Sequence, residues 1–244
     1  MHEHEPWLTA LFNDHLAGAA NSILGIFKMT AENPERPWAT WLVMELLVAA
    51  IIVVLFAALR PRLSVDNPGG LQHLFESLHD FIKTTVQETG IEHPDKFLPY
   101  FGAVFIFILF MNLIGIIPTF ESPTMSASVT LGLALCTFIY YNGWGFREHG
   151  PKYLAQLLGP VLWLSPLMVI IEIISHLARP LSLTIRLYAN MLAGEQVTTA
   201  FEGVVALLVP VIFMGLHVFV AFLQAYIFTL LSMVYVRGAV SHEH

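Results

Sequence analysis

Residues 41–59 read WLVMELLVAAIIVVLFAAL, and their only charged side chain is Glu45, which we place near a membrane interface. A helix needs about 20 apolar residues to cross ~30 Å of hydrocarbon, so this run predicts a transmembrane helix. Arg60 and Arg62 follow the run directly and mark its polar end. The stretch therefore decides the class of the molecule, because a helix this apolar is stable only in lipid.

The composition of the whole chain agrees with this class. Of the 244 residues, 56% are hydrophobic and 12% are charged, and the mean hydropathy is +0.69, whereas about a quarter of an ordinary soluble domain is charged. The net charge of -7 argues against a nucleic-acid partner. The single cysteine, Cys136, excludes an intrachain disulfide, and its apolar surroundings predict a packed, inert thiol.

Further apolar runs follow the first one along the chain. Spans are predicted over 97–117, from 128 onward, over 154–201 and over 204–236, which with 41–59 makes about five transmembrane helices. Residues 71–90 differ, because their apolar side chains recur at three- and four-residue spacing and predict an amphipathic helix on the membrane or against a partner; these are Leu71, Leu74, Phe75, Leu78, Phe81, Ile82 and Val86. The expected fold is an all-α polytopic membrane protein.

The last two runs are too long for an upright helix. A helix over 204–236 is about 50 Å long, and ordinary tilt averages only about 20°. Prolines interrupt both runs, Pro180 and Pro210 among them. We therefore expect these helices, a hairpin over about 154–236, to be broken or strongly tilted against a protein partner.

The chain divides into an N-terminal segment, 1–40, and a single membrane domain, 41–244. The first segment carries acidic residues ahead of the first long apolar run, and it lacks the basic start of a signal peptide. Loop 118–127 has no basic residue, whereas the other side collects Arg60, Arg62, Lys83, Lys96, Arg147 and Lys152. The positive-inside rule then places the N-terminal segment outside and the C-terminus in the cytoplasm.

A charged motif lies inside the apolar C-terminal half, PLSLTIRLYANMLAGE at 180–195. Ser182, Arg186 and Asn190 are spaced by four and share one helix face. Glu195 is about half a turn out of phase with Arg186, so the two face different environments. An arginine at membrane depth costs about 2.5–3.5 kcal/mol, which makes it a functional-site hypothesis; pairing with a carboxylate of this chain is the structural alternative.

Other polar side chains in this half are spaced for contact. Glu172 and His176 are four residues apart, and His217 and Gln224 are seven apart, again on one face. Carboxylates and imidazoles can exchange protons when their surroundings tune them. A guanidinium cannot, so Arg186 is expected to act as a fixed positive barrier and as a partner for a carboxylate on another protein. Arg179, next to Pro180, is expected to be an interfacial anchor.

These residues resemble a known family. The motif from Ser182 to Glu195 resembles the signature of subunit a of bacterial F-type ATP synthases, and the final helix, from His217 through Gln224 to Tyr235, resembles the C-terminus of that subunit. PGGLQ at 68–72 and MNLIGIIP at 111–118 also match, and the resemblance covers about residues 38–240.

The resemblance implies a stator subunit in a bacterial plasma (inner) membrane. It would lie beside a rotating ring of subunit c, whose hairpins each carry an essential carboxylate, and it would assemble with peripheral-stalk subunit b and the remainder of the ATP synthase. Two half-channels would carry protons to and from the ring. By position, Arg186 is the essential arginine, Glu195, His217 and Gln224 are access-channel residues, Asn190 and Ser182 face the ring, and Glu172 lines the exit side.

The resemblance is not complete. Ala189 stands where many relatives have glycine, and segment 123–130 has serines where relatives often have Asn or Asp, so Glu121 is a substitute candidate on the outer side.

The resulting hypothesis is a proton-channel subunit that couples proton translocation to ATP synthesis and has no ATP site, cofactor or metal of its own. The phosphate loop Gly-x-x-x-x-Gly-Lys-[Ser/Thr] is absent from the sequence. A secondary proton/cation transporter is the rival, although no repeated half with matching interruptions supports it. An intramembrane hydrolase lacks its motifs.

Overall fold

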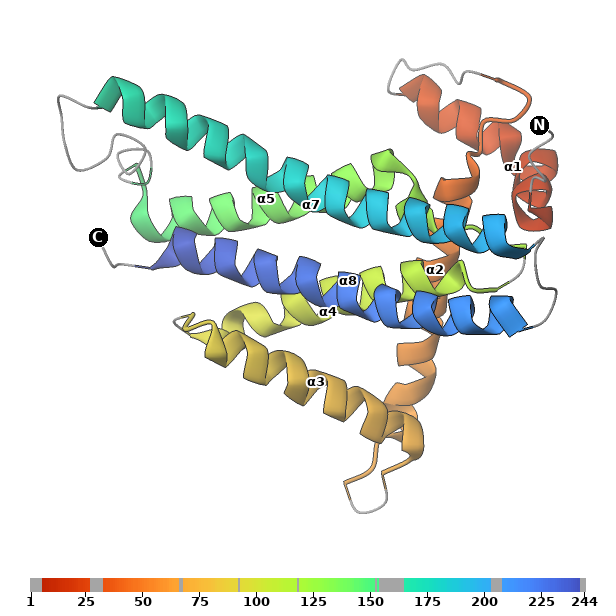
Figure 1. Ribbon diagram of the computed structural model, residues 1–244, viewed down its shortest axis with the longest axis horizontal. Helices are drawn as coiled ribbons and strands as arrows, with labels where there is room; N and C mark the ends of the chain where they lie inside the picture. The colour runs from red at the N-terminus through yellow and green to blue at the C-terminus, as the bar shows by residue number, and fades with distance from the viewer. Residues whose placement is uncertain are drawn as a thin grey trace.

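The structure, a computed structural model, describes residues 6–26, 33–65, 68–91, 93–117, 119–151, 153, 165–202 and 208–241. Every regular element in these residues is a helix, which confirms the all-α prediction (Figure 1). The elements are α1 (Trp7–Ile26), α2 (Thr40–Leu59), η1 (Arg60–Arg62), α3 (Gly70–Glu88), α4 (Pro94–Ile114), η2 (Pro123–Met125), α5 (Ala127–His149), α7 (Ser165–Glu202) and α8 (Leu208–Val240).

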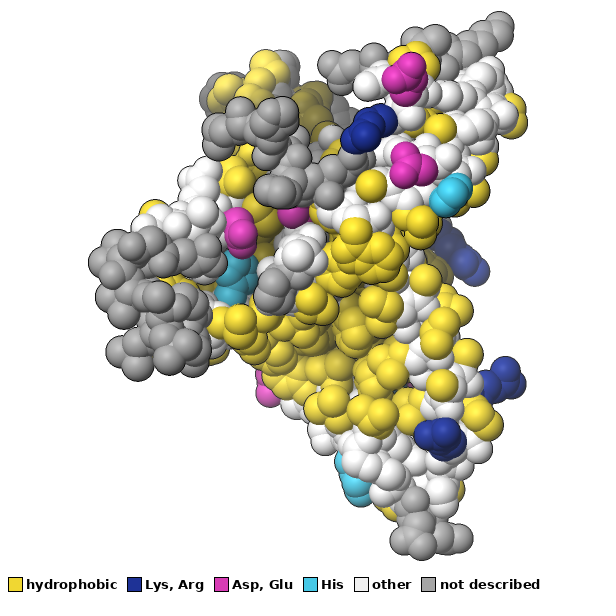
Figure 2. Space-filling view, turned by 90° about the vertical axis from the view of Figure 1, so that its right-hand side faces the viewer, with side chains coloured by type: hydrophobic (Ala, Val, Ile, Leu, Met, Phe, Trp, Pro, Cys, Tyr) yellow, Lys and Arg dark blue, Asp and Glu magenta, His cyan; other side chains and the backbone are white. Residues whose placement is uncertain are grey.

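The helices α2, α4, α7 and α8 are long and apolar enough to cross a membrane. A further helix, α5, has a comparable length of 23 residues but a more polar sequence. Figure 2 shows apolar side chains over the middle of one face, with the described charged side chains around this area. These features are those of a polytopic membrane protein.

The long helices do not share the direction of α2. In Figure 1, α7 and α8 run side by side in opposite directions, α5 and α4 lie along them, and α2 crosses this layer. With 38 and 33 residues, α7 and α8 are about 57 and 50 Å long. A bilayer that α2 crosses upright therefore leaves α7 and α8 strongly inclined, as their lengths predict.

The sequence left open whether the long helices are broken or tilted, and α7 is continuous across Pro180. Proline lacks an N–H and removes one helical hydrogen bond, but membrane helices tolerate it where side chains satisfy the backbone. The carbonyl that Pro180 leaves without its helical donor is that of His176, four residues earlier. The hydrogen bond from Thr184 Oγ1 to the Pro180 carbonyl oxygen, at 2.8 Å, is an additional bond on the following turn. Of the predicted hairpin, residues 154–164 and 203–207 lie outside the described residues.

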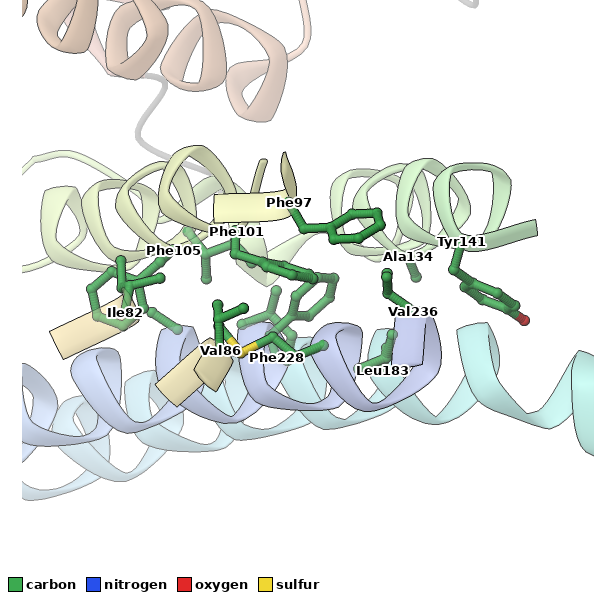
Figure 3. Close-up of a cluster of buried hydrophobic side chains, with 14 of the residues drawn as sticks. Ile82, Val86, Phe97, Phe101, Phe105, Ala134, Tyr141, Leu183, Phe228 and Val236 are labelled. Carbon is green, nitrogen blue, oxygen red and sulfur yellow. The ribbon is translucent and has the colours of Figure 1, made fainter. Parts of the chain in front are cut away.

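The core is aromatic and lies where α4 meets α3 and α8. Phe97, Phe101 and Phe105 of α4 belong to one buried cluster with Phe228 of α8 (Figure 3). Ile82 and Val86 of α3 are buried in the same cluster, whereas Leu71 and Leu74 at the start of that helix are 56% and 62% exposed. The amphipathic helix is confirmed, and the second half of its apolar face packs on the membrane domain itself.

The helices differ from the predictions in several places, and at two of them polar residues extend a helix beyond its apolar run. Segment 1–40 contains the unpredicted helix α1. At the start of α4, Pro94 and Asp95 lie in the first turn, where a missing N–H and a negative charge are both tolerated. Arg147 and His149 form the last turn of α5, where positive charge suits the helix dipole.

The prediction for Cys136 was wrong, because its side chain is exposed. It lies on a face of α5 that also exposes Leu135 and Ile139. An apolar run in a membrane helix is buried in lipid rather than in protein, so hydrophobic neighbours do not imply packing.

Hydrogen bonds join the helix α1 to the segment before α2. Asn13 Oδ1 accepts a hydrogen bond from the Trp38 backbone N–H at 2.9 Å, and Asn13 Nδ2 donates to the Trp38 carbonyl oxygen at 3.2 Å. The Trp38 indole N–H donates to the Leu16 carbonyl oxygen at 2.9 Å. These bonds hold α1 at the beginning of the first membrane span.

The C-terminal end of α5 is closed by Tyr153. Burial raises the pKa of its phenol to about 12, so the phenol stays protonated at neutral pH and donates to Asn142 Oδ1 at 3.1 Å. The ring lies over Gly145, where a Cβ would stand 2.6 Å from Tyr153 Cε2.

We therefore expect Gly145→Ala to destabilise the protein by about 1–3 kcal/mol, because the added methyl displaces a packed aromatic ring. The measurement is the unfolding temperature of the full-length chain in detergent. Gly143→Ala is the matched control, since a Cβ there meets nothing within 4 Å. Equal unfolding temperatures for the two variants would contradict the packing argument.

Candidate functional site

A pocket of about 360 Å³ lies between α7 and α8. It brings together three side chains that the sequence singled out: Asn190 from α7, and His217 and Gln224 from α8. Its other walls are apolar or small, from Ala193, Gly194, Val197, Thr198, Phe213, Leu216, Val220, Leu223 and Ile227. Three polar side chains thus line a mainly apolar pocket between two membrane helices, which is roomy enough for several waters.

Gly194 leaves room in this pocket for the imidazole ring of His217. A Cβ at residue 194 would stand 3.5 Å from His217 Cε1 and 3.8 Å from its Nε2. An alanine would only touch the imidazole, but a longer side chain would occupy the space in front of it. The glycine at this position therefore keeps the approach between α7 and the imidazole open.

Arg186 lies on an outward face of α7. It is half-buried, and its neighbours Ser182, Ile185 and Asn190 are exposed, as the four-residue spacing predicts. Among the described residues, no hydrogen bond or ion pair of Arg186 is found. The alternative of a structural pair within the chain thus has no support there, although a guanidinium in a membrane span needs a partner.

Arg179, seven residues earlier, is in a different situation. Its guanidinium carbon lies 5.3 Å from the ring centre of Tyr235 on α8 and 5.9 Å from that of Tyr141 on α5. Such cation–π contacts stabilise a cation inside the chain. Of these two α7 arginines, only Arg186 is left for a partner from outside.

Glu195 is half-buried on α7 and does not line the α7–α8 pocket. No ion pair between Glu195 and Arg186 exists in the described part of the chain, in agreement with their phases on one continuous helix. Glu195 is therefore not among the residues that line the pocket with His217 and Gln224.

A second polar cluster joins α7 to α5. Glu172 Oε1 lies 3.6 Å from His176 Nε2, which confirms the contact predicted from their spacing. On its other side, His176 Nδ1 is 3.3 Å from the Tyr141 hydroxyl. Glu172 is thus held in a chain of titratable groups that leads from the surface of α7 toward a buried tyrosine.

A buried polar network that was not predicted from the sequence joins α4 to α8. Asn112 of α4 is fully buried, donates from Nδ2 to the Ala221 carbonyl oxygen of α8 at 3.3 Å, and accepts from Thr124 Oγ1 at 2.7 Å. Thr124 Oγ1 lies 2.7 Å from Ser122 Oγ. An amide inside the apolar run 97–117 was the available signal, because polar side chains at membrane depth join helices or line pathways.

This network begins at a second, polar pocket. Ser122 and Glu121 line a cavity of about 740 Å³ between the N-terminal segment, α2 and η2, together with Asn13, Arg36 and Trp38. At its other end, the network reaches Ala221, one helical turn before Gln224. Buried hydroxyl and amide groups therefore lead from the polar cavity to the backbone of α8, one helical turn before Gln224.

Among the described residues, no group of three or more His, Cys, Asp or Glu side chains could hold a metal ion.

The chain was compared with known proteins. The family model described as ATP synthase A chain matches residues 41–237. The ATP synthase subunit a of Solibacter usitatus (strain Ellin6076) is 58% identical over 96% of this chain and 100% of the relative. That of Koribacter versatilis (strain Ellin345) is 46% identical over 99% of both chains, and that of Sulfurihydrogenibium sp. (strain YO3AOP1) is 39% identical over 83% of this chain and 98% of the relative. The chain therefore belongs to the ATP synthase A chain family.

Proposed function

We propose that the chain is the stator subunit of the membrane sector of a rotary ATP synthase, and that it couples proton translocation to ATP synthesis. The observation that carries this proposal is Arg186, a permanent charge on the outward face of a membrane helix, without a partner among the described residues. A carboxylate presented by a ring of subunit c would complete it. The peripheral-stalk subunit b and the remainder of the synthase are the other expected partners.

The outer half-channel is proposed to start at the polar cavity lined by Glu121 and Ser122. From there, protons would pass the buried hydroxyls of Ser122 and Thr124 and the amide of Asn112. They would then enter the α7–α8 pocket at Gln224 and His217, and reach Asn190 on the face that also carries Arg186. Glu195 would exchange protons at the rim of this route.

The other half-channel is proposed to run past Glu172. Glu172, Arg179 and Arg186 recur every seven residues and follow one stripe of α7, with Ser182 close beside it. Glu172 with His176 would exchange protons with water at the far end. The cavity side is then the outside, and the C-terminus lies in the cytoplasm, as the distribution of basic loops predicts.

Electrostatics would couple the rotation of the ring to proton transfer. A ring carboxylate crosses lipid only when protonated, because an ionised group at that depth is costly, and it ionises opposite Arg186. Arg186 keeps its charge at every accessible pH, so protons cannot pass it directly from one half-channel to the other. Each 100 mV across the membrane supplies about 2.3 kcal/mol per proton.

The experiment that tests this route replaces Gln224 by leucine in membranes that hold the whole complex. We expect ATP-driven proton pumping to fall at least about tenfold, equivalent to ~1.4 kcal/mol, because the amide that holds water in the pocket is lost. The measurement is the quenching of a pH-sensitive dye in inverted vesicles.

Gln87→Leu on α3 is the matched control, since Gln87 is exposed and far along the chain from both pockets. It should leave pumping unchanged. Normal pumping by the Gln224→Leu complex would rule out a proton route through this pocket. The rival transporter predicts substrate-coupled proton exchange by the chain alone in liposomes.

A further inference from the structure

A large groove opens between α2, α3 and α4, away from the proposed proton route. Its volume is about 890 Å³. Most of its walls are apolar or small, and they are Ala49, Ile52, Val53 and Phe56 of α2 and Leu98, Pro99, Gly102, Ala103, Ile106 and Phe107 of α4. The remaining three lining residues are polar: His79 and Lys83 of α3, and Asp95 at the start of α4.

The groove covers only one half of α2. Its lining residues there begin about 6 Å and end about 16 Å from Arg60, at a rise of 1.5 Å per residue. The other half of α2 is occupied, since Val43, Met44 and Val48 are buried within the chain. One leaflet of a ~30 Å hydrocarbon layer is about 15 Å deep. The groove therefore has the depth of one leaflet.

Two polar residues of the groove, Lys83 and Asp95, carry opposite charges and do not form an ion pair with each other. Lys83 is partly buried and Asp95 is exposed, and within the described ranges neither has an ion-pair partner. Both line the groove together with Phe56, which lies about one helical turn before Arg60 at the end of α2. A cation and an anion thus stand at the mouth of an apolar groove, at the level where lipid headgroups lie.

We propose that this groove binds one phospholipid whose headgroup carries both a phosphate and a primary ammonium, as in phosphatidylethanolamine. Lys83, with His79 beside it, would bind the phosphate, and Asp95 would bind the ammonium. The acyl chains would lie along Val53 and Ala103. A transmembrane helix fits less well, because it would need a groove across both leaflets.

Gly102 provides a way to close the groove. A Cβ at this residue meets nothing within 4 Å, so it would project into open space rather than into the core. Gly102→Leu therefore fills the groove without disturbing the packing around it. Gly132→Leu on α5 is the matched control, because Gly132 is an exposed helical glycine that, like Gly102, has open space around its Cβ.

The experiment uses membranes that contain the whole complex and a phosphatidylethanolamine with a photoactivatable acyl chain. After irradiation, mass spectrometry of the digested chain locates the labelled peptides. We expect label on 49–56 and 98–107, its loss in Gly102→Leu, and its retention in Gly132→Leu. Lys83→Gln should lower labelling about two- to fivefold, the scale of one partly exposed ionic contact, and it serves if Gly102→Leu fails to assemble.

Competing lipids separate the specific site from ordinary lipid contact. Unlabelled phosphatidylethanolamine should displace the label better than phosphatidylglycerol, which lacks the ammonium, or phosphatidylcholine, which lacks its N–H donors. Equal displacement by all three lipids, unchanged labelling of Gly102→Leu, or cross-linking of these segments to a membrane helix of another subunit would each overturn the proposal.

Discussion

Replacement of Arg186 by alanine is expected to abolish ATP-driven proton pumping by the complex while its ATP hydrolysis largely continues. The guanidinium is the positive charge on the outward face of α7 that can meet a ring carboxylate, because Arg179 is held by the rings of Tyr141 and Tyr235. Without it, the ionised carboxylate loses its partner and the two half-channels are no longer separated. Dye quenching in inverted vesicles and phosphate release measure the two activities.

Two further variants make this result specific. Arg186→Lys keeps the charge but replaces the planar fork by a point charge, so we expect it to restore little pumping if bidentate pairing is required. Arg179→Ala removes an equivalent charge one stripe position away and should reduce stability more than pumping. Sustained pumping by Arg186→Ala would refute the proposed function, whichever route the protons take.

The second large effect is expected from Gly194→Leu. The leucine side chain would extend from the α7 wall toward His217, whose ring lies 3.5 Å from the position of a Cβ. It would fill the space that we propose for water in the pocket lined by Asn190 and Gln224. Proton flux through the pocket should fall by more than about tenfold, since an apolar plug cannot reproduce the hydrogen bonds of water. The rate of pumping at fixed ATP hydrolysis is the quantity to measure.

Gly194→Ala provides a graded control, because its methyl group only reaches ordinary contact with the imidazole. It should retain most of the pumping. Gly143→Leu, at an exposed glycine of α5 with open space around it, tests whether a leucine anywhere in the domain disturbs assembly. Loss of pumping in Gly143→Leu as well would show that the effect does not come from the pocket.

The features that could be predicted from the sequence depend on residues that lie close together in the chain. The apolar run at 41–59, the periodicity of 71–90 and the lengths of the last two runs gave the membrane class, the amphipathic helix and the inclined pair, because each follows from one helix and its solvent. The spacing of Glu172 and His176 gave their contact for the same reason. The N-terminal helix α1 was missed, since its stability depends on Asn13 and Trp38, which are distant in sequence.

The sequence by itself determined that this chain lies in lipid and that one helix face carries Ser182, Arg186 and Asn190. Only the tertiary structure decided that Arg179 is held within the chain while Arg186 has no described partner, that His217 and Gln224 share a pocket with Asn190, and that Asn112 joins α4 to α8 next to it. Helical spacing fixes which side chains share a face of one helix. Which face meets which neighbour is set by packing between helices. In a membrane, a face that packs on another helix can be as apolar as a face that meets lipid, so the sequence does not distinguish the two.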